Sequence, residues 1–98
     1  MIENVAHVKA DTTRLILNAT DWTPAYVGAA NLPGRKWLLI QNKSNVRMAY
    51  SPSNSKVYKD CPELGVGDKV VLPISDSLTF YLKAQTGAVK YAAVMELA

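Results

Sequence analysis

Short stretches of this chain alternate between hydrophobic and polar residues with a period of two, which is typical of half-buried β-strands. The alternation is clearest at 46–50, where Val46, Met48 and Tyr50 share one side and Arg47 and Ala49 the other. The same pattern recurs in four further stretches, 12–19, 69–74, 78–83 and 88–97. Helical periodicity is nearly absent, so the pattern predicts an all-β protein.

The stretch 35–41 differs because it is apolar on both faces. It follows the turn-forming residues Leu32-Pro33-Gly34 and contains Trp37-Leu38-Leu39-Ile40 before ending at Gln41-Asn42. A strand that is apolar on both faces indicates a packed layer on each side of it. In a chain of 98 residues, one of those layers can be another subunit.

Together with a possible short strand at 56–58, these stretches predict about seven short antiparallel strands at the spacing of a sandwich or barrel. We therefore predict one domain over residues 1–98, a single β-sandwich of jelly-roll or immunoglobulin-like Greek-key type. Residues 1–10 are expected to form an N-terminal arm or an edge strand, and a short strand is expected at 56–58. The predicted core consists of Trp37, Leu39, Val70, Leu72, Leu78, Phe80, Leu82, Tyr91 and Met95.

The last strand carries a second apolar surface. Ala92 and Val94 lie on one face between Lys90 and Glu96, a pattern typical of an interface core with a charged rim. We therefore predict that Ala92 and Val94 contact other subunits in a homo-oligomer or symmetric array. The alternative is that an internal second sheet covers this face, and it applies most directly to Leu38 and Ile40.

Composition favours an interface as well. Charged residues make up 19% of the chain, below the roughly 25% typical of soluble domains. The net charge of +3 comes from scattered lysines and arginines without any basic run, which argues against a nucleic-acid partner.

The single cysteine excludes an internal disulfide, and the sequence contains no signal-peptide pattern or apolar run of transmembrane length. These features predict a product made in the cytoplasm, with no membrane partner.

No group of residues points to catalysis, a metal or a cofactor. His7 is the only histidine, and no Cys, Asp or Glu stands at metal-ligand spacing from it. It is also the only imidazole that could act as a base for Cys61. Gly65-Val66-Gly67-Asp68 lacks the lysine and hydroxyl residue of a phosphate loop, so it is interpreted as a turn. We expect a protein that is not an enzyme.

Three aromatic residues, Trp22, Tyr26 and Tyr58, lie in connections between the expected strands. An interface role and simple packing fit them equally well. The alternative function is a β-sandwich binding module that uses these loop aromatics to hold carbohydrate or nucleic acid.

Several short motifs resemble a family of small virion proteins of tailed bacteriophages. The residues that carry the resemblance are Leu32-Pro33-Gly34-Arg35-Lys36, Leu38, Ile40, Gln41, Asn42, Tyr50, Gly65-Val66-Gly67-Asp68, Leu78, Tyr81 and Val94-Met95-Glu96-Leu97. The resemblance covers roughly the last two-thirds of the chain. The chain departs from the family pattern where Ser51-Pro52, instead of a glycine, follows Tyr50.

The resemblance implies a structural protein that decorates or cements the head, or an accessory protein of the neck or tail. Its partners would be the major capsid protein, the portal or other neck and tail proteins. It would be located in the virion, after synthesis in the host cytoplasm. The family has no catalytic residues to transfer to this chain.

Overall fold

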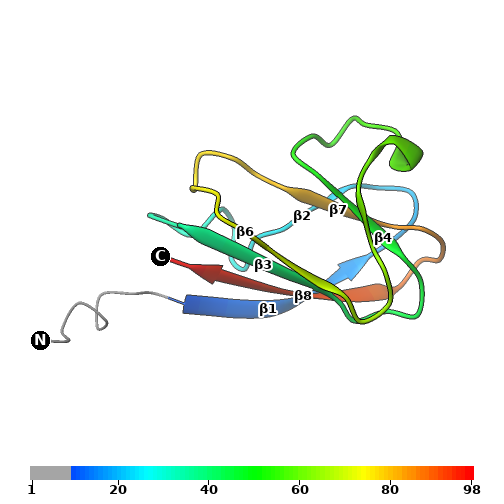
Figure 1. The fold of residues 1–98 in the computed structure, drawn as a ribbon, viewed down its shortest axis with the longest axis horizontal. Coiled ribbons are helices and arrows are strands. Elements are labelled where there is room, and N and C mark those ends of the chain that lie inside the picture. The colour runs from blue at the N-terminus through cyan, green and yellow to red at the C-terminus, as the bar shows by residue number, and fades with distance from the viewer. Residues whose placement is uncertain (1–9) are drawn as a thin grey trace, which may run out of the picture.

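The computed structural model describes residues 10–98, which form two antiparallel sheets of four strands each (Figure 1). The first sheet has the order β1-β8-β3-β6 and the second the order β2-β7-β4-β5. The strands of the first sheet are β1 (Ala10–Leu17), β8 (Lys90–Leu97), β3 (Trp37–Asn42) and β6 (Lys69–Leu72). Those of the second are β2 (Thr23–Pro24), β7 (Tyr81–Ala84), β4 (Met48–Ser51) and β5 (Glu63–Leu64). Among the described residues, the only helix is the 3₁₀ turn η1 (Tyr58–Asp60), so the all-β prediction is confirmed.

The strands pair in a nested pattern along the chain. β1 pairs with β8, β2 with β7, β3 with β6 and β4 with β5, all antiparallel. The two halves of the chain therefore run alongside each other like one long hairpin. Further pairing of β3 with β8 and of β4 with β7 folds that hairpin into the two sheets.

The core lies between the two sheets. The first sheet contributes Leu38 and Ile40, which lie opposite Glu96 and Val94 in the β3–β8 register. The second sheet contributes residues of β4, β5 and β7 to the same cluster. The fully or almost fully buried members include Leu17, Leu38, Ile40, Ala92, Val94, Met48, Leu64, Leu82 and Ala84.

This arrangement corrects the prediction that Ala92 and Val94 form an intermolecular interface. Both side chains are completely buried within the chain, so they cannot contact another subunit. The alternative is correct, because the second sheet covers this face together with Leu38 and Ile40. Small residues on β8 let the second sheet approach closely, because the interior of a protein is packed without large voids.

The predicted core is correct in part. Leu82 is fully buried, and Val70, Leu72 and Phe80 pack partly buried against the core cluster. Four other members point to the opposite side of the first sheet, away from the core: Trp37, Leu39, Tyr91 and Met95. The prediction places the β8 face with Lys90 and Glu96 outward, as a charged rim, whereas the structure buries Glu96 on the core side of that strand.

Leu78 was also predicted to be in the core, and it is exposed. The strand begins only at Tyr81, three residues later than expected. The reason is that the backbone carbonyl of Leu78 accepts a hydrogen bond from Arg35 Nη2. That carbonyl is therefore held by a side chain of another segment.

The predicted turns are confirmed. The Arg35 N–H donates to the carbonyl of Leu32 at 3.0 Å, and Gly34 has φ +74°, which is a type II turn with proline and glycine at its two central positions. The Gly65–Asp68 turn has the same design, with Gly67 at φ +82° and a 3.0 Å bond from Asp68 N–H to the Gly65 carbonyl.

Two other predictions have different outcomes. The short strand expected at 56–58 is wrong, because Lys56 lies in a bend, Val57 caps η1 and Tyr58 is its first residue. The N-terminal arm or edge strand expected at 1–10 lies outside the described residues except for Ala10, which begins β1. Within residues 10–98, no helix has the length and apolar character needed to cross a membrane.

Candidate interaction surface

The side of the first sheet that faces away from the core is mostly apolar. The registers place Trp37 opposite Leu97, Leu39 opposite both Met95 and Val71, and Ile16 opposite Tyr91 on this side. We call this surface the outer face. Its members on the four strands are Thr12, Arg14, Ile16, Trp37, Leu39, Gln41, Lys69, Val71, Tyr91, Ala93, Met95 and Leu97.

Several large side chains of the outer face are open to solvent. The exposed fractions are 57% for Ile16, 45% for Trp37 and 48% for Val71. Trp37 and Val71 lie next to the half-buried Leu39 and Met95, whereas Ile16 lies beside Tyr91, beyond the row of Arg14, Ala93, Gln41 and Lys69. Contiguous apolar patches of this kind mark interaction sites more often than they mark ordinary surface.

The charges on the outer face have one sign. The strand residues that point outward include Arg14 and Lys69 but, among residues 10–98, no aspartate or glutamate. The guanidinium carbon of Arg14 lies 4.3 Å from the centre of the Tyr91 ring, a cation–π contact that holds the charge flat against the sheet. Glu96 points to the core side of β8, where it is buried.

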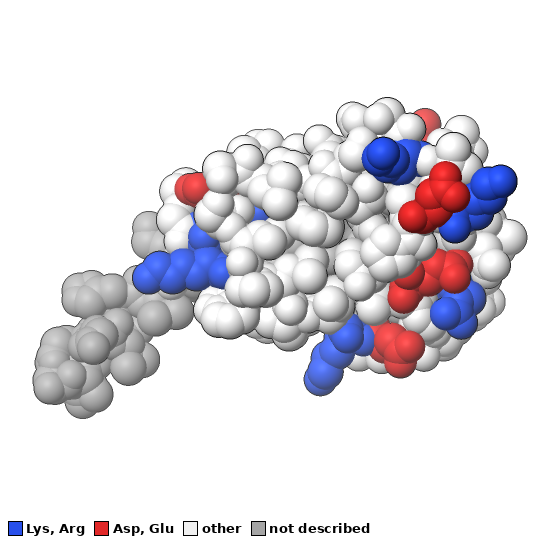
Figure 2. Space-filling view, turned by 45° about the horizontal axis from the view of Figure 1, so that its top comes forward, with Lys and Arg blue, Asp and Glu red and all other residues white. Residues whose placement is uncertain are grey.

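The charge distribution of the wider surface follows the long axis of the molecule. On the face seen in Figure 2, acidic and basic side chains gather at the end that carries η1, and a smaller group lies toward the opposite end. The middle of that face is nearly free of charge.

The corresponding side of the second sheet is covered by the chain itself. Ala49 and Ser51 are buried although they alternate along β4 with the core-facing Met48 and Tyr50. Trp22 lies over this side, because Lys83 Nζ of β7 is 5.6 Å from the centre of its ring.

The same tryptophan holds the 52–62 loop. Trp22 Nε1 donates a 3.1 Å hydrogen bond to the carbonyl of Lys56 in that loop. The loop and Trp22 therefore cover the second sheet, whereas no described segment covers the outer face.

Tyr58 is also engaged within the chain. Its hydroxyl donates to Glu63 Oε2 at 2.7 Å, and Arg47 Nε lies 3.4 Å from Glu63 Oε1. Partial burial, together with the hydrogen bond and the negative charge of Glu63, raises the pKa of Tyr58 well above its ordinary value. This tyrosine therefore stays a neutral donor that fastens η1 to β5.

The aromatic residues predicted as interface residues do not form one site. Trp22 and Tyr58 both secure the region around the 52–62 loop. Tyr26 is half-buried and precedes Val27, whose N–H donates to Glu96 Oε1 at the end of the molecule where the chain terminates (Figure 1). Ala92 and Val94 lie in the core.

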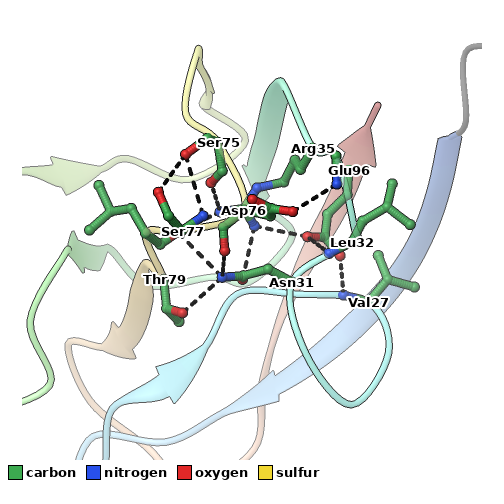
Figure 3. Close-up of polar contacts among 11 residues, drawn as sticks. Val27, Asn31, Leu32, Arg35, Ser75, Asp76, Ser77, Thr79 and Glu96 are labelled. Carbon is green, nitrogen blue, oxygen red and sulfur yellow. Dashed lines mark hydrogen bonds and ion pairs between the residues drawn. The ribbon is translucent and has the colours of Figure 1, made fainter.

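A buried ion pair organises that end of the molecule. Arg35 Nη1 donates to Glu96 Oε2 at 2.8 Å, and both side chains are essentially inaccessible to solvent. Figure 3 shows Arg35 and Glu96 pointing toward each other, with the 25–35 and 75–79 segments around them.

Each partner also binds backbone groups. Glu96 accepts hydrogen bonds from the N–H groups of Val27 and Leu32, and Arg35 donates to the carbonyls of Ser75 and Leu78. The pair therefore joins two loops to β8 at the point where the chain enters β3. It sets the position of Trp37, which follows Arg35 by two residues.

The described residues contain no group of three or more His, Cys, Asp and Glu side chains arranged to hold a metal ion. Cys61 Sγ contacts the carbonyl of Val57 at 3.5 Å, and His7 lies outside the described residues. Nothing in this geometry assigns a chemical step to the chain.

The sequence reasoning missed the outer face, although one signal for it was present. The 35–41 stretch was recognised as apolar on both faces, but the face with Trp37 and Leu39 was assigned to the core. Neither the scan of protein-family models nor the search of curated proteins finds a match to this chain.

Proposed function

We propose that this protein is a non-enzymatic structural protein of a tailed-bacteriophage virion, which binds the capsid or the head–tail neck through protein–protein contacts. The observation that carries the proposal is the outer face, a largely apolar sheet surface that no described segment covers, whereas Trp22 and the 52–62 loop cover the second sheet. An assembly protein needs such a surface, because a stable interface has an apolar core that excludes water. The motif resemblance supplies the virion as its location.

We also propose that the two sheets form a jelly roll rather than an immunoglobulin-like sandwich. The nested pairing of β1 with β8, β2 with β7, β3 with β6 and β4 with β5 supports this type, since a jelly roll is an eight-stranded double sheet of two Greek keys. Jelly rolls are frequent in viral capsid proteins. That frequency is an argument by analogy of fold, and the outer face remains the stronger one.

Self-association in a symmetric array belongs to the same proposal, but it needs a surface other than Ala92 and Val94. The outer edge of β1 is suitable. It is eight residues long, it pairs only with β8 among the described strands, and it contains no proline or lysine that would discourage strand addition.

The binding-module alternative gains no support from the aromatic residues on which it relied. The Trp22 indole N–H and the Tyr58 hydroxyl are both bound to other groups of the chain. Neither polar group is therefore free to donate a hydrogen bond to a glycan or a base, and Lys83 Nζ already lies over the Trp22 ring.

The test is the protein composition of purified particles of the phage whose genome carries this gene. We expect the chain in the particles, at a constant ratio to the portal or the major capsid protein, after density-gradient purification. Its complete absence from particles, with the protein recovered only in the unassembled fraction, would overturn the proposal.

A further inference from the structure

We propose that the outer face docks a different protein of the particle, whose own surface is apolar and bears carboxylates opposite Arg14 and Lys69. This inference rests on the proposed virion function and adds the chemistry of the partner. It excludes a second copy of this chain and a nucleic acid as the occupant of this face.

The two central strands of the first sheet present apolar side chains on the outer face. β8 and β3 are the two inner strands, and their outward side chains include Trp37, Leu39, Met95 and Leu97. These side chains present a flat, mainly aliphatic surface with one large aromatic anchor. Such a surface matches the core of a protein interface, in which aromatic residues and methionine are enriched.

The two edge strands of the sheet each carry one basic residue on this face. Arg14 lies on the edge strand β1 and Lys69 on the opposite edge strand β6. Arg14, Ala93, Gln41 and Lys69 form one row across the outer face, next to the apolar row of Met95, Leu39 and Val71, and no outward-pointing carboxylate on the described strands balances the two basic residues. A partner that bears carboxylates at both ends of the first row would pair with these charges and fix the orientation of docking.

A second copy does not fit this surface. A two-fold contact between identical faces places each patch against itself, so Arg14 and Lys69 would meet apolar residues, uncharged polar residues such as Gln41, or one another. The described strands offer no acidic group on that face to receive them. Like charges brought together in this way disfavour the contact.

A nucleic acid fits it less well than a protein does. The outer face has two basic residues, one of which already lies against Tyr91, whereas nucleic-acid sites concentrate many positive charges along the backbone path. Ile16, Leu39 and Val71 would also be left against phosphates or sugars without apolar contacts.

The experiment measures binding of the purified full-length protein to particles assembled without it. Val71→Glu places an acid on the outer face at a side chain that is 48% exposed, so the fold tolerates the change. Its matched control is Val66→Glu, in the Gly65–Asp68 turn, where the valine is 61% exposed. Arg14→Glu and Lys69→Glu reverse the charge of the two basic residues, and Lys59→Glu in η1 is the control with the same change in charge.

We expect Val71→Glu, Arg14→Glu and Lys69→Glu each to weaken binding by about tenfold or more, while both control variants bind like the wild type. Binding of the wild type should also weaken as salt is raised, because exposed charge pairs are screened. Equal binding of Val71→Glu and Val66→Glu would overturn the inference while leaving the virion function intact. Failure of the wild type to bind any particle would instead count against the proposed function.

Two further outcomes would also overturn the inference. The first is a wild-type dimer in sedimentation that Val71→Glu converts to a monomer and Val66→Glu does not, which would identify a second copy. The second is tight binding of a single-stranded oligonucleotide that Arg14→Glu and Lys69→Glu both abolish, which would identify a nucleic acid.

Discussion

Glu96 is a carboxylate that this fold keeps out of water near the end of β8. Its charge is neutralised by Arg35 at 2.8 Å and its oxygens accept two backbone N–H groups as well. A buried ion pair adds little stability compared with an apolar pair of the same volume, but losing one member leaves an uncompensated charge. The pair therefore acts mainly to specify how the 25–35 and 75–79 loops meet β8.

We predict that Glu96→Gln lowers the free energy of unfolding by about 3–5 kcal/mol, because Arg35 is left charged and buried without a counter-ion. Chemical denaturation followed by circular dichroism measures this loss. The control is Asp11→Asn, which removes an exposed carboxylate on the neighbouring strand β1 and should change stability by less than about 0.5 kcal/mol. A loss below about 1 kcal/mol for Glu96→Gln would contradict the role given to the ion pair.

At the level of elements, alternation in the sequence located the six longest described strands and the two glycine turns. It also identified the stretch 35–41 as apolar on both faces. The alternation did not predict which face of β3 and of β8 points to the core. Both faces of these strands carry apolar residues, so a period of two cannot distinguish the inner face from the outer one. The choice is made by the Arg35–Glu96 pair and by the small size of Ala92, and both depend on contacts between distant segments.

The second-sheet cover was not predictable either. The sequence predicts intermolecular contacts for the long Ser51–Leu64 loop, which contains Tyr58. It gives no sign that Trp22, more than thirty residues earlier in the chain, holds the backbone of this loop at Lys56. No local pattern indicates a hydrogen bond over that separation.

We predict that Trp22→Phe loosens this loop, because phenylalanine keeps the apolar ring but loses the indole N–H. Limited proteolysis should cut the 52–62 segment several times faster, and stability should fall by about 1 kcal/mol, the typical contribution of one hydrogen bond. The matched variant is Trp37→Phe on the outer face, which should leave the cleavage rate unchanged. Equal cleavage of Trp22→Phe and the wild type would show that the loop is held by other contacts.

At the level of the whole molecule, the two sheets treat their outer sides differently. The second sheet is shielded by Trp22 and the 52–62 loop, whereas the first presents Ile16, Trp37 and Val71 to solvent. The apolar residues of this chain, which has few charges, therefore form both a core between the sheets and one exposed surface on the first sheet. The docking surface could not be found from the sequence, since it was hidden in the set of residues assigned to the core.

The most direct test of the outer face as a docking surface is hydroxyl-radical footprinting of the wild-type protein, free and in intact particles. Trp37 and Met95 report on the outer face, and Trp22 reports on the covered second sheet. If the outer face docks a partner, labelling of Trp37 and Met95 falls strongly in particles while labelling of Trp22 changes little. Unchanged labelling of Trp37 and Met95, with new protection of Trp22 and the 52–62 loop, would contradict docking through the outer face.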